Sequence, residues 1–433
     1  MFIHELQSMI ESSDMRGIFI GEEFMDILLL LYADDLCIFD DTVIGLQRKI
    51  DILSNFCKKW GLEINMSKTE ILVFRRGGTL RYDERWFLND KRINVSTYYS
   101  YLGVLFSNRL SWTKCIDTLK IKANKALFAI KQLQFHFVNM PVNILFKLFD
   151  IKIKPILLYG AEIWGCKGSQ IVETFHTKFC KFVLGVGKYV SSTAILAESG
   201  RNGLHVDYHM KCVKYWCKLI RMNDERYPRQ CYLLMKKLDE CGRITWATHV
   251  KYLLDIYGFG NVWYEQNIGD VKCFLQLFRQ RLLDCNKQSI QMKIYESRKL
   301  RYYSHVKILL DMEYYVTAFR NRDHRKFIIC DLDMMCLLRL SELPIRSNLG
   351  RREDIDSSQR FCRLCNNGCI EDEVHFVFVC PFYATLRQKF IPVRFYSNPC
   401  IKTFSNLLNS KNDCILRNVA KYVKEALLLS TKS

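Results

Sequence analysis

Residues 28–39 read LLLLYADDLCIF, an apolar run that two adjacent aspartates interrupt before it resumes. Apolar residues on both sides of a short polar break are typical of a β-hairpin, so we expect two strands joined by a turn at 33–35. Adjacent at that turn, Asp34 and Asp35 repel each other unless a cation lies nearby. Because Mg²⁺ prefers oxygen ligands, such a pair suits Mg²⁺-dependent phosphoryl transfer. The pair alone is a weak signal, and the apolar strands on both sides, with Tyr32 directly before Ala33, favour this interpretation. The alternative is an ordinary polar turn, where aspartate is common.

The composition favours an intracellular protein with a polyanionic partner. The chain has 433 residues and a formal net charge of +19, and 49% of its residues are apolar, enough for a substantial core in two or three domains. Such a positive charge favours nucleic acid as the partner, the alternative being a merely basic protein. The 19 cysteines are scattered over the whole length, unlike a secreted disulfide framework. We therefore expect free thiols, a nuclear or cytoplasmic location, and no membrane partner, because the apolar runs are too short to span a bilayer.

On the C-terminal side of the hairpin the hydrophobic period changes several times. Apolar residues at spacings of three and four predict a helix over 42–60, with Asp40 or Asp41 as its cap. Short strands are predicted at 62–65 and 69–74. The later predicted elements are a strand or hairpin at 96–106, a basic helix at 112–133, further helices to about 330, and a closing amphipathic helix at 413–429.

Several motifs, in order, resemble those of non-LTR (LINE-type) retrotransposon reverse transcriptases. Tyr-Ala-Asp-Asp at 32–35 resembles their central active-site motif, GLEINMSKTEILVF (61–74) resembles the motif that follows, and YLGV (101–104) resembles the primer-grip hairpin. Ordered motifs are more specific than any single one. Three further segments resemble the region that follows the polymerase core in the same elements: PILLYGAEIWG (155–165), LGVGK (184–188) and AESGR (197–201).

The resemblance implies an α+β fold in several parts. A partial polymerase palm, an antiparallel sheet with helices, would occupy 1–110. A mainly helical thumb and a following helical region would occupy 111–345. The polar stretch 346–360 is interpreted as a linker to a small zinc-binding segment at 361–383, and 384–433 as a helical tail.

The resemblance also implies roles for individual residues. Asp34 would hold a catalytic Mg²⁺ ion, with Asp35 beside it. Lys68 would assist the pyrophosphate leaving group, because a lysine can donate a proton or neutralise negative charge; the alternative is a solvated turn lysine. Lysines of the 112–133 helix would track phosphates, or simply form the solvated face of a core helix. The residues implied to contact the primer, template or nucleotide are Tyr32, Ala33, Tyr101, Leu102, Gly103, Lys120, Lys122 and Lys125.

The implied activity is that of an RNA-directed DNA polymerase, which uses two Mg²⁺ ions to add dNTPs to a DNA primer on an RNA template. The family carries another aspartate and a glycine- and glutamine-containing segment upstream of Tyr-Ala-Asp-Asp. The 31 residues before Tyr32 contain no matching context. We therefore expect a C-terminal part of such an enzyme, with a truncated palm, that is inactive alone. The alternative is a non-catalytic nucleic-acid-binding protein that uses basic helices and a zinc segment.

The segment FCRLCNNGCIEDEVHFVFVCPFY (361–383) predicts a metal site. Cys362, Cys365, His375 and Cys380 follow a C-x2-C-x9-H-x4-C pattern, which suits tetrahedral Zn²⁺, and Cys369 could replace one ligand. The alternative is a cluster of buried thiols. LINE-type reverse transcriptases carry a similar segment near the C-terminus, which implies that it grips nucleic acid, as zinc knuckles do.

A basic, aromatic stretch at 299–327 precedes this segment. It interleaves lysine and arginine with tyrosine, a composition that suits backbone contact and base stacking. The alternative interpretation is a solvated amphipathic helix pair.

Overall fold

A computed structural model describes residues 2–13, 17–20, 25–75, 77–136, 140–307, 310–318, 331–365 and 367–431. Helices and short strands together confirm the α+β class. The chain forms two compact units that alternate along the sequence. Unit 1 comprises Met1–Leu119, Tyr159–Gly168 and Tyr208–Leu275, and unit 2 comprises Lys120–Leu158, Ser169–Asp207 and Gln276–Ser433.

The opening stretch forms the expected hairpin. Strands β3 (Leu29–Tyr32) and β4 (Asp35–Ile38) pair antiparallel, with Tyr32 opposite Asp35 and a two-residue turn between them. Ala33 in that turn has a φ of 55°, a left-handed conformation that costs a residue with a Cβ about 1–2 kcal/mol. The preceding strands β1 (Ile18–Ile20) and β2 (Met25–Ile27) also pair antiparallel.

Helix α2 (Val43–Trp60) follows the hairpin, as its periodicity predicts. Its cap is Thr42, whose hydroxyl accepts a 3.0 Å hydrogen bond from the Gly45 amide. The prediction of Asp40 or Asp41 as the cap is wrong: Asp40 accepts from the Thr42 amide at 2.8 Å and so orients the capping residue. The helix ends at Gly61, which has a φ of 66°.

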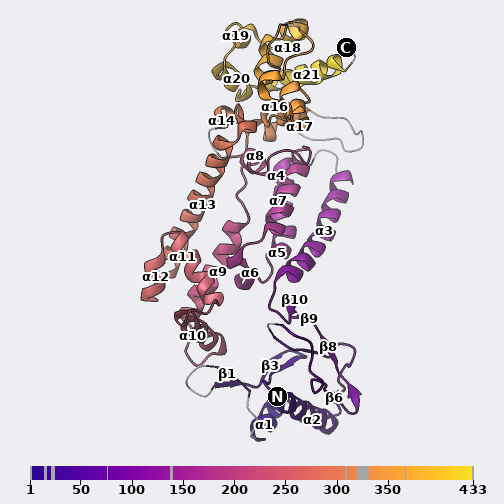
Figure 1. Ribbon diagram of the computed structural model, residues 1–433, viewed down its shortest axis with the longest axis vertical. Helices are drawn as coiled ribbons and strands as arrows, with labels where there is room; N and C mark the ends of the chain where they lie inside the picture. Colours follow the sequence, from indigo (N-terminus) through magenta and orange to yellow (C-terminus); the bar gives the residue numbers. More distant parts are fainter. Residues whose placement is uncertain are drawn as a thin grey trace. The chain divides into compact units, whose positions relative to one another are not determined.

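Two apolar clusters fix α2 in unit 1. The first joins α2 to α1 (Phe2–Glu11) and to the base of the hairpin, around Leu28, Leu29 and Phe56. Figure 1 shows α1 and α2 side by side in the indigo N-terminal segment. The second cluster lies against other α2 residues and consists of Ile50, Trp86, Leu88 and Ile93 with half-buried neighbours. The hairpin is therefore anchored at its base, while its tip is exposed.

The other strands form small paired sheets in unit 1. The strand predicted at 62–65 is wrong: this segment is irregular, because Asn65 accepts from the Ser67 amide at 3.1 Å and turns the chain. Of the strand or hairpin predicted at 96–106, the structure forms the hairpin. The pairs are β5 (Glu70–Leu72) with β8 (Asn94–Ser96), parallel; β6 (Phe87–Leu88) with β7 (Lys91–Arg92), antiparallel; and β9 (Tyr98–Tyr101) with β10 (Val104–Ser107), antiparallel.

Helices dominate the described residues after β10. Helix α3 (Thr113–His136) confirms the predicted basic helix, with Ile116, Leu119, Ala123 and Ile130 buried. Those up to residue 300 are α4 (Val142–Leu148), η1 (Phe149–Ile153), α5 (Lys154–Leu157), α6 (Ala161–Trp164), η2 (Gly165–Lys167), α7 (Gln170–Val183), α8 (Ser192–Glu198), α9 (His205–Ile220), α10 (Tyr227–Glu240), α11 (Trp246–Ile256), α12 (Gly260–Glu265), α13 (Val271–Glu296) and η3 (Arg298–Leu300).

The C-terminal part of unit 2 is also helical, and α21 confirms the predicted closing helix. The polar stretch interpreted as a linker contains helix α17 and the short helix η4, with Asn348 and Gly350 buried. The elements are α14 (Tyr303–Val306), α15 (Tyr314–Ala318), α16 (Asp331–Arg339), α17 (Arg346–Arg352), η4 (Ser357–Gln359), η5 (His375–Val379), η6 (Pro381–Tyr383), α18 (Ala384–Phe390), α19 (Val393–Tyr396), α20 (Ile401–Leu408) and α21 (Asp413–Ser430).

A buried polar network joins distant segments of unit 2. The Arg339 guanidinium, fully buried, donates from Nε to Glu198 at 2.5 Å and from Nη1 to the Leu408 carbonyl at 2.9 Å. Tyr303 and Tyr315 also donate to Glu198, at 2.7 and 2.6 Å. The Nη2 atom of Arg339 lies 3.0 Å from a carboxylate oxygen of Glu313, a second anion beside this charge. Removal of one partner of such a buried charge leaves it uncompensated.

Two features concern the whole described chain. The described cysteines are free thiols, as the sequence predicts. Among the described residues, no helix combines the length and the apolarity that a bilayer span requires.

Candidate functional site

The β3–β4 turn presents two carboxylates at the surface of unit 1. Asp34 and Asp35 are exposed, and Tyr32 before them keeps 63% of its surface exposed. Asp35 lies close enough to β9 to act on two tyrosines electrostatically. Burial, followed by the negative charge of Asp35, raises the pKa of Tyr99, and burial together with Cys37 and Asp35 raises that of Tyr101.

The turn that carries Lys68 also contacts β9. The Tyr99 hydroxyl donates a 3.1 Å hydrogen bond to the Lys68 carbonyl oxygen, and the Lys68 side chain itself is exposed. The amide of Lys68 donates to the Asn65 carbonyl at 3.1 Å, which closes the turn. Tyr99 therefore connects the segment of Lys68 to the strand beside Asp35. Sequence reasoning missed Tyr99, although it lies in the strand or hairpin predicted at 96–106.

The turn between β9 and β10 is held in an unusual conformation. Leu102 and Gly103 have φ values of 48° and 79°, and a leucine in this region is strained. The Tyr159 hydroxyl donates a 2.8 Å hydrogen bond to the Leu102 carbonyl. The Tyr159 ring also lies 3.4 Å from the position that a Cβ on Gly103 would occupy. Tyr159 thus braces the proposed primer-contacting turn, and its only sequence signal is its place in PILLYGAEIWG.

The three lysines of the basic helix belong to unit 2. Lys120, Lys122 and Lys125 are exposed on α3 and lie outside its buried apolar stripe. Their geometry suits contact with a polyanion, and it equally suits a solvated helix face.

The predicted Cys/His residues gather in unit 2. One ligand atom from each of Cys362, Cys365, His375 and Cys380 lies within 4.8 Å of the others. The Cys362 and Cys380 sulfurs are 3.9 Å apart, and the Cys365 sulfur lies 3.5 Å from His375 Nε2. Tetrahedral Zn²⁺ with its usual bond lengths separates two sulfurs by about 3.8 Å and a sulfur from a nitrogen by about 3.5 Å. The donor set and its spacing therefore fit this ion.

Local backbone structure explains how the four ligands meet. An isolated β-bridge pairs Phe361 with Ile370, so the chain reverses directly around the first two cysteines. The π-helical turn η5 then carries His375 and ends at Cys380, whose amide donates to the His375 carbonyl at 2.8 Å. π-Helical turns are rare in proteins overall, and those that occur are frequently found at functional sites. Cys369 lies outside the four-residue group and is exposed.

The turn that carries the ligands is tied to the helices behind it. Buried Arg387 of α18 donates to the carbonyls of Val377 and Cys380, at 2.9 and 2.5 Å. Tyr422 of α21 donates to the Phe376 carbonyl at 2.5 Å. The Cys/His segment is therefore integrated with the C-terminal helices and differs from an isolated knuckle.

The protonation of these ligands responds to their burial. Burial raises the pKa of the Cys362 thiol, and it raises that of Cys380 to about 12. Burial lowers the pKa of His375, which favours the neutral ring that a metal requires. Its Nδ1 atom is buried and has no hydrogen-bond partner. A metal ion would remove the thiol protons, because cysteine binds metals as the thiolate.

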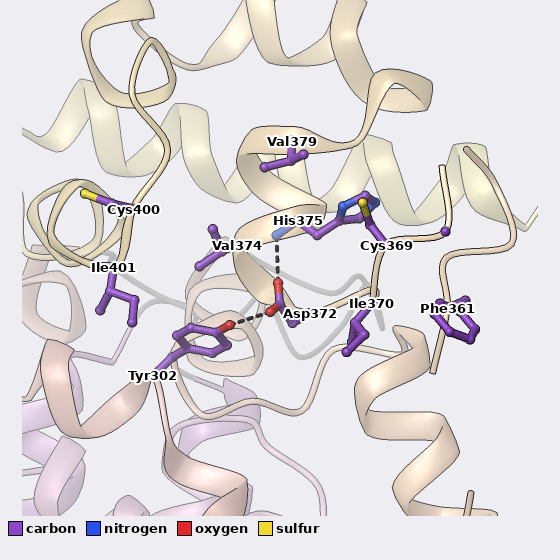
Figure 2. A pocket seen from close by; sticks show the side chains of 11 residues that line it. Tyr302, Phe361, Cys369, Ile370, Asp372, Val374, His375, Val379, Cys400 and Ile401 are labelled. Carbon is purple, nitrogen blue, oxygen red and sulfur yellow. Dashed lines mark hydrogen bonds between the residues drawn. The ribbon is translucent and has the colours of Figure 1, made fainter. Parts of the chain in front are cut away.

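A cavity of about 560 Å³ opens beside this cluster. Figure 2 shows Asp372 between Tyr302 and His375 on its wall: the Tyr302 hydroxyl donates to the carboxylate, which also accepts from the His375 amide at 2.8 Å. Apolar side chains, including Phe361 and Ile370, form much of the remaining lining.

The basic stretch at 299–327 only partly matches its prediction. Residues 319–327 lie outside the described residues. Tyr303 and Tyr315 are at most 1% exposed and donate to Glu198, so they are unavailable for base stacking.

Comparison with known proteins connects unit 1 to polymerases. Residues 1–106 match the family model described as "Reverse transcriptase (RNA-dependent DNA polymerase)". The chain is 23% identical over 175 residues to the "Probable RNA-directed DNA polymerase from transposon BS" of Drosophila melanogaster, a match that covers 40% of this chain and 19% of that protein. The chain therefore spans about a fifth of the length of this relative, and its N-terminal region is similar to a reverse transcriptase domain.

Proposed function

We propose that this chain is part of a LINE-type RNA-directed DNA polymerase and that it engages an RNA template and a DNA primer. The observation that carries the proposal is the β3–β4 hairpin, where Tyr32, Ala33, Asp34 and Asp35 form an exposed turn beside β9. The match of residues 1–106 to reverse transcriptases supports it. The neighbouring turn at Leu102 and Gly103, braced by Tyr159, would contact the primer backbone.

The chain's own residues would divide the chemistry between them. Asp34, with Asp35 beside it, would hold Mg²⁺; when bound, two such ions stabilise the attacking and leaving oxygens of nucleotidyl transfer. Lys68, exposed on its turn, would donate a proton to the pyrophosphate leaving group. Tyr32 and Ala33 would lie against the primer end and the incoming dNTP.

The metal site at the hairpin has few ligands. Among the described residues, only the Cys362 cluster brings together three or more His, Cys, Asp or Glu side chains in a metal-holding arrangement. Two exposed carboxylates bind Mg²⁺ weakly, because affinity depends on the number and geometry of ligands. We therefore expect the chain alone to bind primer–template without extending it.

A primer-extension assay tests this proposal. Purified protein is mixed with an RNA template, a fluorescent DNA primer, dNTPs and Mg²⁺, and both binding and extension are followed. We expect binding of the duplex and no extension, in wild type and in Asp34→Ala alike. Mg²⁺-dependent extension that Asp34→Ala abolishes would refute the inactivity of the isolated chain, and failure to bind primer–template would refute the proposal as a whole.

The Cys/His cluster supports a second role, that of a non-catalytic nucleic-acid binder. We propose that Zn²⁺ occupies the cluster, because the sulfur and nitrogen separations fit it. The two roles predict different effects of a substitution in the β3–β4 hairpin. A binder should keep its affinity for nucleic acid when Asp34→Ala is introduced, whether Mg²⁺ is present or not, whereas a polymerase site should show Mg²⁺-dependent dNTP binding that this variant removes.

A further inference from the structure

Four cationic side chains surround the loop between α7 and α8 in unit 2. Val186 and Val190 of this loop are buried, whereas Gly187, Lys188 and Tyr189 are exposed. Lys188 is the first of the four cations. The other three come from α7, η3 and α17, segments far apart in the sequence: Lys181, Lys299 and Arg352.

The contacts around the loop are specific. The Lys181 ammonium donates to the Lys188 carbonyl at 3.1 Å, and the Lys299 ammonium donates to the Tyr189 carbonyl at 2.9 Å. Over the Tyr189 ring lie the Lys188 ammonium, 5.0 Å from its centroid, and the Arg352 guanidinium, 5.1 Å from it. Even so, Tyr189 keeps 61% of its surface exposed.

The carboxylate of Glu342 neutralises part of this positive charge. Glu342, whose side chain is 4% exposed, pairs with Lys299 and accepts from Arg352 at 2.9 Å. These four cations and one anion leave an excess of positive charge around an exposed ring. Burial and the positive charges of Lys299 and Lys178 lower the pKa of Lys181, although the negative charge of Glu342 acts in the opposite direction. An anion bound beside the loop would reduce this repulsion.

We propose that the Lys188–Tyr189 loop is a binding site for single-stranded nucleic acid, in which the surrounding cations hold a phosphate and Tyr189 stacks against a base. This inference rests on the proposed function and specifies a surface for its polyanionic partner. An exposed aromatic ring among cations recognises both parts of a nucleotide, because phosphates need positive charge and every base offers a π-face. A polyanion without bases would offer the Tyr189 ring no π-face to stack against.

The test compares two probes by fluorescence anisotropy: a fluorescent oligothymidylate, and polyphosphate as a competitor that has charge and no bases. We expect Tyr189→Leu to weaken oligothymidylate binding about tenfold and to leave polyphosphate binding unchanged. We expect Lys188→Ala and Arg352→Ala to weaken both, and each to lower the slope of log affinity against log salt by about 0.7. An oligouridylate in place of oligothymidylate distinguishes RNA from DNA.

Matched variants elsewhere control for general effects. Lys389 lies 4.6 Å from the centroid of the Phe390 ring, so Lys389→Ala removes a similar surface lysine. Tyr264 is 70% exposed with Lys251 over its ring, so Tyr264→Leu removes a similar tyrosine. Both controls should bind the oligonucleotide like wild type. Circular dichroism and metal content confirm that each variant is folded.

The outcomes separate the two proposals. If the wild type binds oligonucleotides and the loop variants bind equally well, the loop site is refuted while the proposed function stands. If Tyr189→Leu weakens polyphosphate and oligothymidylate equally, the stacking role is refuted. If the wild type binds neither oligonucleotides nor primer–template, the proposed function fails and the loop site fails with it. A photocrosslink from 5-iodouracil to Tyr189 would support the site directly, and crosslinks confined to other segments would contradict it.

Discussion

The hydroxyl of Tyr159 donates a 2.8 Å hydrogen bond to the carbonyl oxygen of Leu102, so that a residue 57 positions away fixes the turn between β9 and β10. The turn needs such support, because Leu102 has a φ of 48°. Strained backbone persists where surrounding contacts over-determine it, and this often occurs at functional sites.

The Tyr159→Phe variant should loosen this turn. It removes one neutral hydrogen bond, which contributes about 1 kcal/mol, and keeps the ring that packs against Gly103. Amides of β9 and β10 should then exchange hydrogen about fivefold faster by mass spectrometry. Tyr82→Phe, at a tyrosine that is 84% exposed, should leave exchange unchanged. Equal protection in wild type and Tyr159→Phe would show that the bond is unimportant for the turn.

Loss of Asp40 should destabilise unit 1 strongly. Its carboxylate lies 2.7 Å from the Lys49 ammonium, and the two side chains are 4% and 0% exposed. The Asp40→Ala variant removes the carboxylate that pairs with this buried ammonium, and we expect it to cost about 3–5 kcal/mol in urea unfolding. The neighbouring Asp41→Ala, at an exposed position, should cost little. The double variant Asp40→Ala/Lys49→Met should recover most of the loss, and failure to recover would point instead to the hydrogen bond that the Thr42 amide donates to Asp40.

Removal of the metal should destabilise unit 2. We expect one Zn²⁺ per chain by elemental analysis, and a chelator or Cys365→Ser should lower the melting temperature by about 5 °C or more. Zn²⁺ binding should release protons from the thiols, since the pKa of Cys380 is about 12 without metal. The Cys369→Ser variant should bind Zn²⁺ like wild type, because Cys369 lies outside the cluster. Loss of metal in that variant would assign Cys369 as a ligand.

Buried His176 should make unit 2 sensitive to mild acid. Burial, with the charge of Arg201, lowers its pKa from 6.5 to about 3. The unfolded chain therefore binds a proton near pH 6.5 that the folded chain refuses, and stability falls by about 1.4 kcal/mol per unit as the pH drops from 6.5 towards 3. The pKa values of Asp150 and Glu173 are lowered from 3.8 and 4.5, so their effect lies at lower pH.

The control for this pH effect is His176→Phe, which keeps an aromatic ring near Phe149. Urea unfolding at several pH values between 6.5 and 5 should show a smaller decline for the variant than for wild type. Parallel curves for the two proteins would show that His176 is protonated in the folded state and contradict the prediction.

The sequence predicts features that depend on local spacing. Apolar residues at intervals of three and four, with Gly61 after them, define α2. The spacing of Cys362 and Cys365 makes a chelating turn whichever fold surrounds it. The choice of Thr42 rather than Asp40 as the cap could not be predicted, because both residue types favour that position.

Contacts between distant segments leave no periodic pattern. The hydroxyl of Tyr99 reaches the Lys68 carbonyl only after β5 and β9 come together. The same holds for Arg339, which a sequence pattern would assign to the surface and which the fold buries against Glu198. These side chains connect elements that sequence patterns predict only one at a time.

The alternation of the two units has a consequence for synthesis on the ribosome. All segments of unit 1 have been translated by residue 275, whereas Ser169–Asp207 of unit 2 must wait for Gln276–Ser433. At about 5–20 residues per second, Glu198 emerges roughly 10–50 s before the last residues of its unit. During that interval its segment lacks Arg339, Tyr303 and Tyr315, so the apolar helices of Ser169–Asp207 stay open to chaperones and proteases until Gln276–Ser433 has been translated.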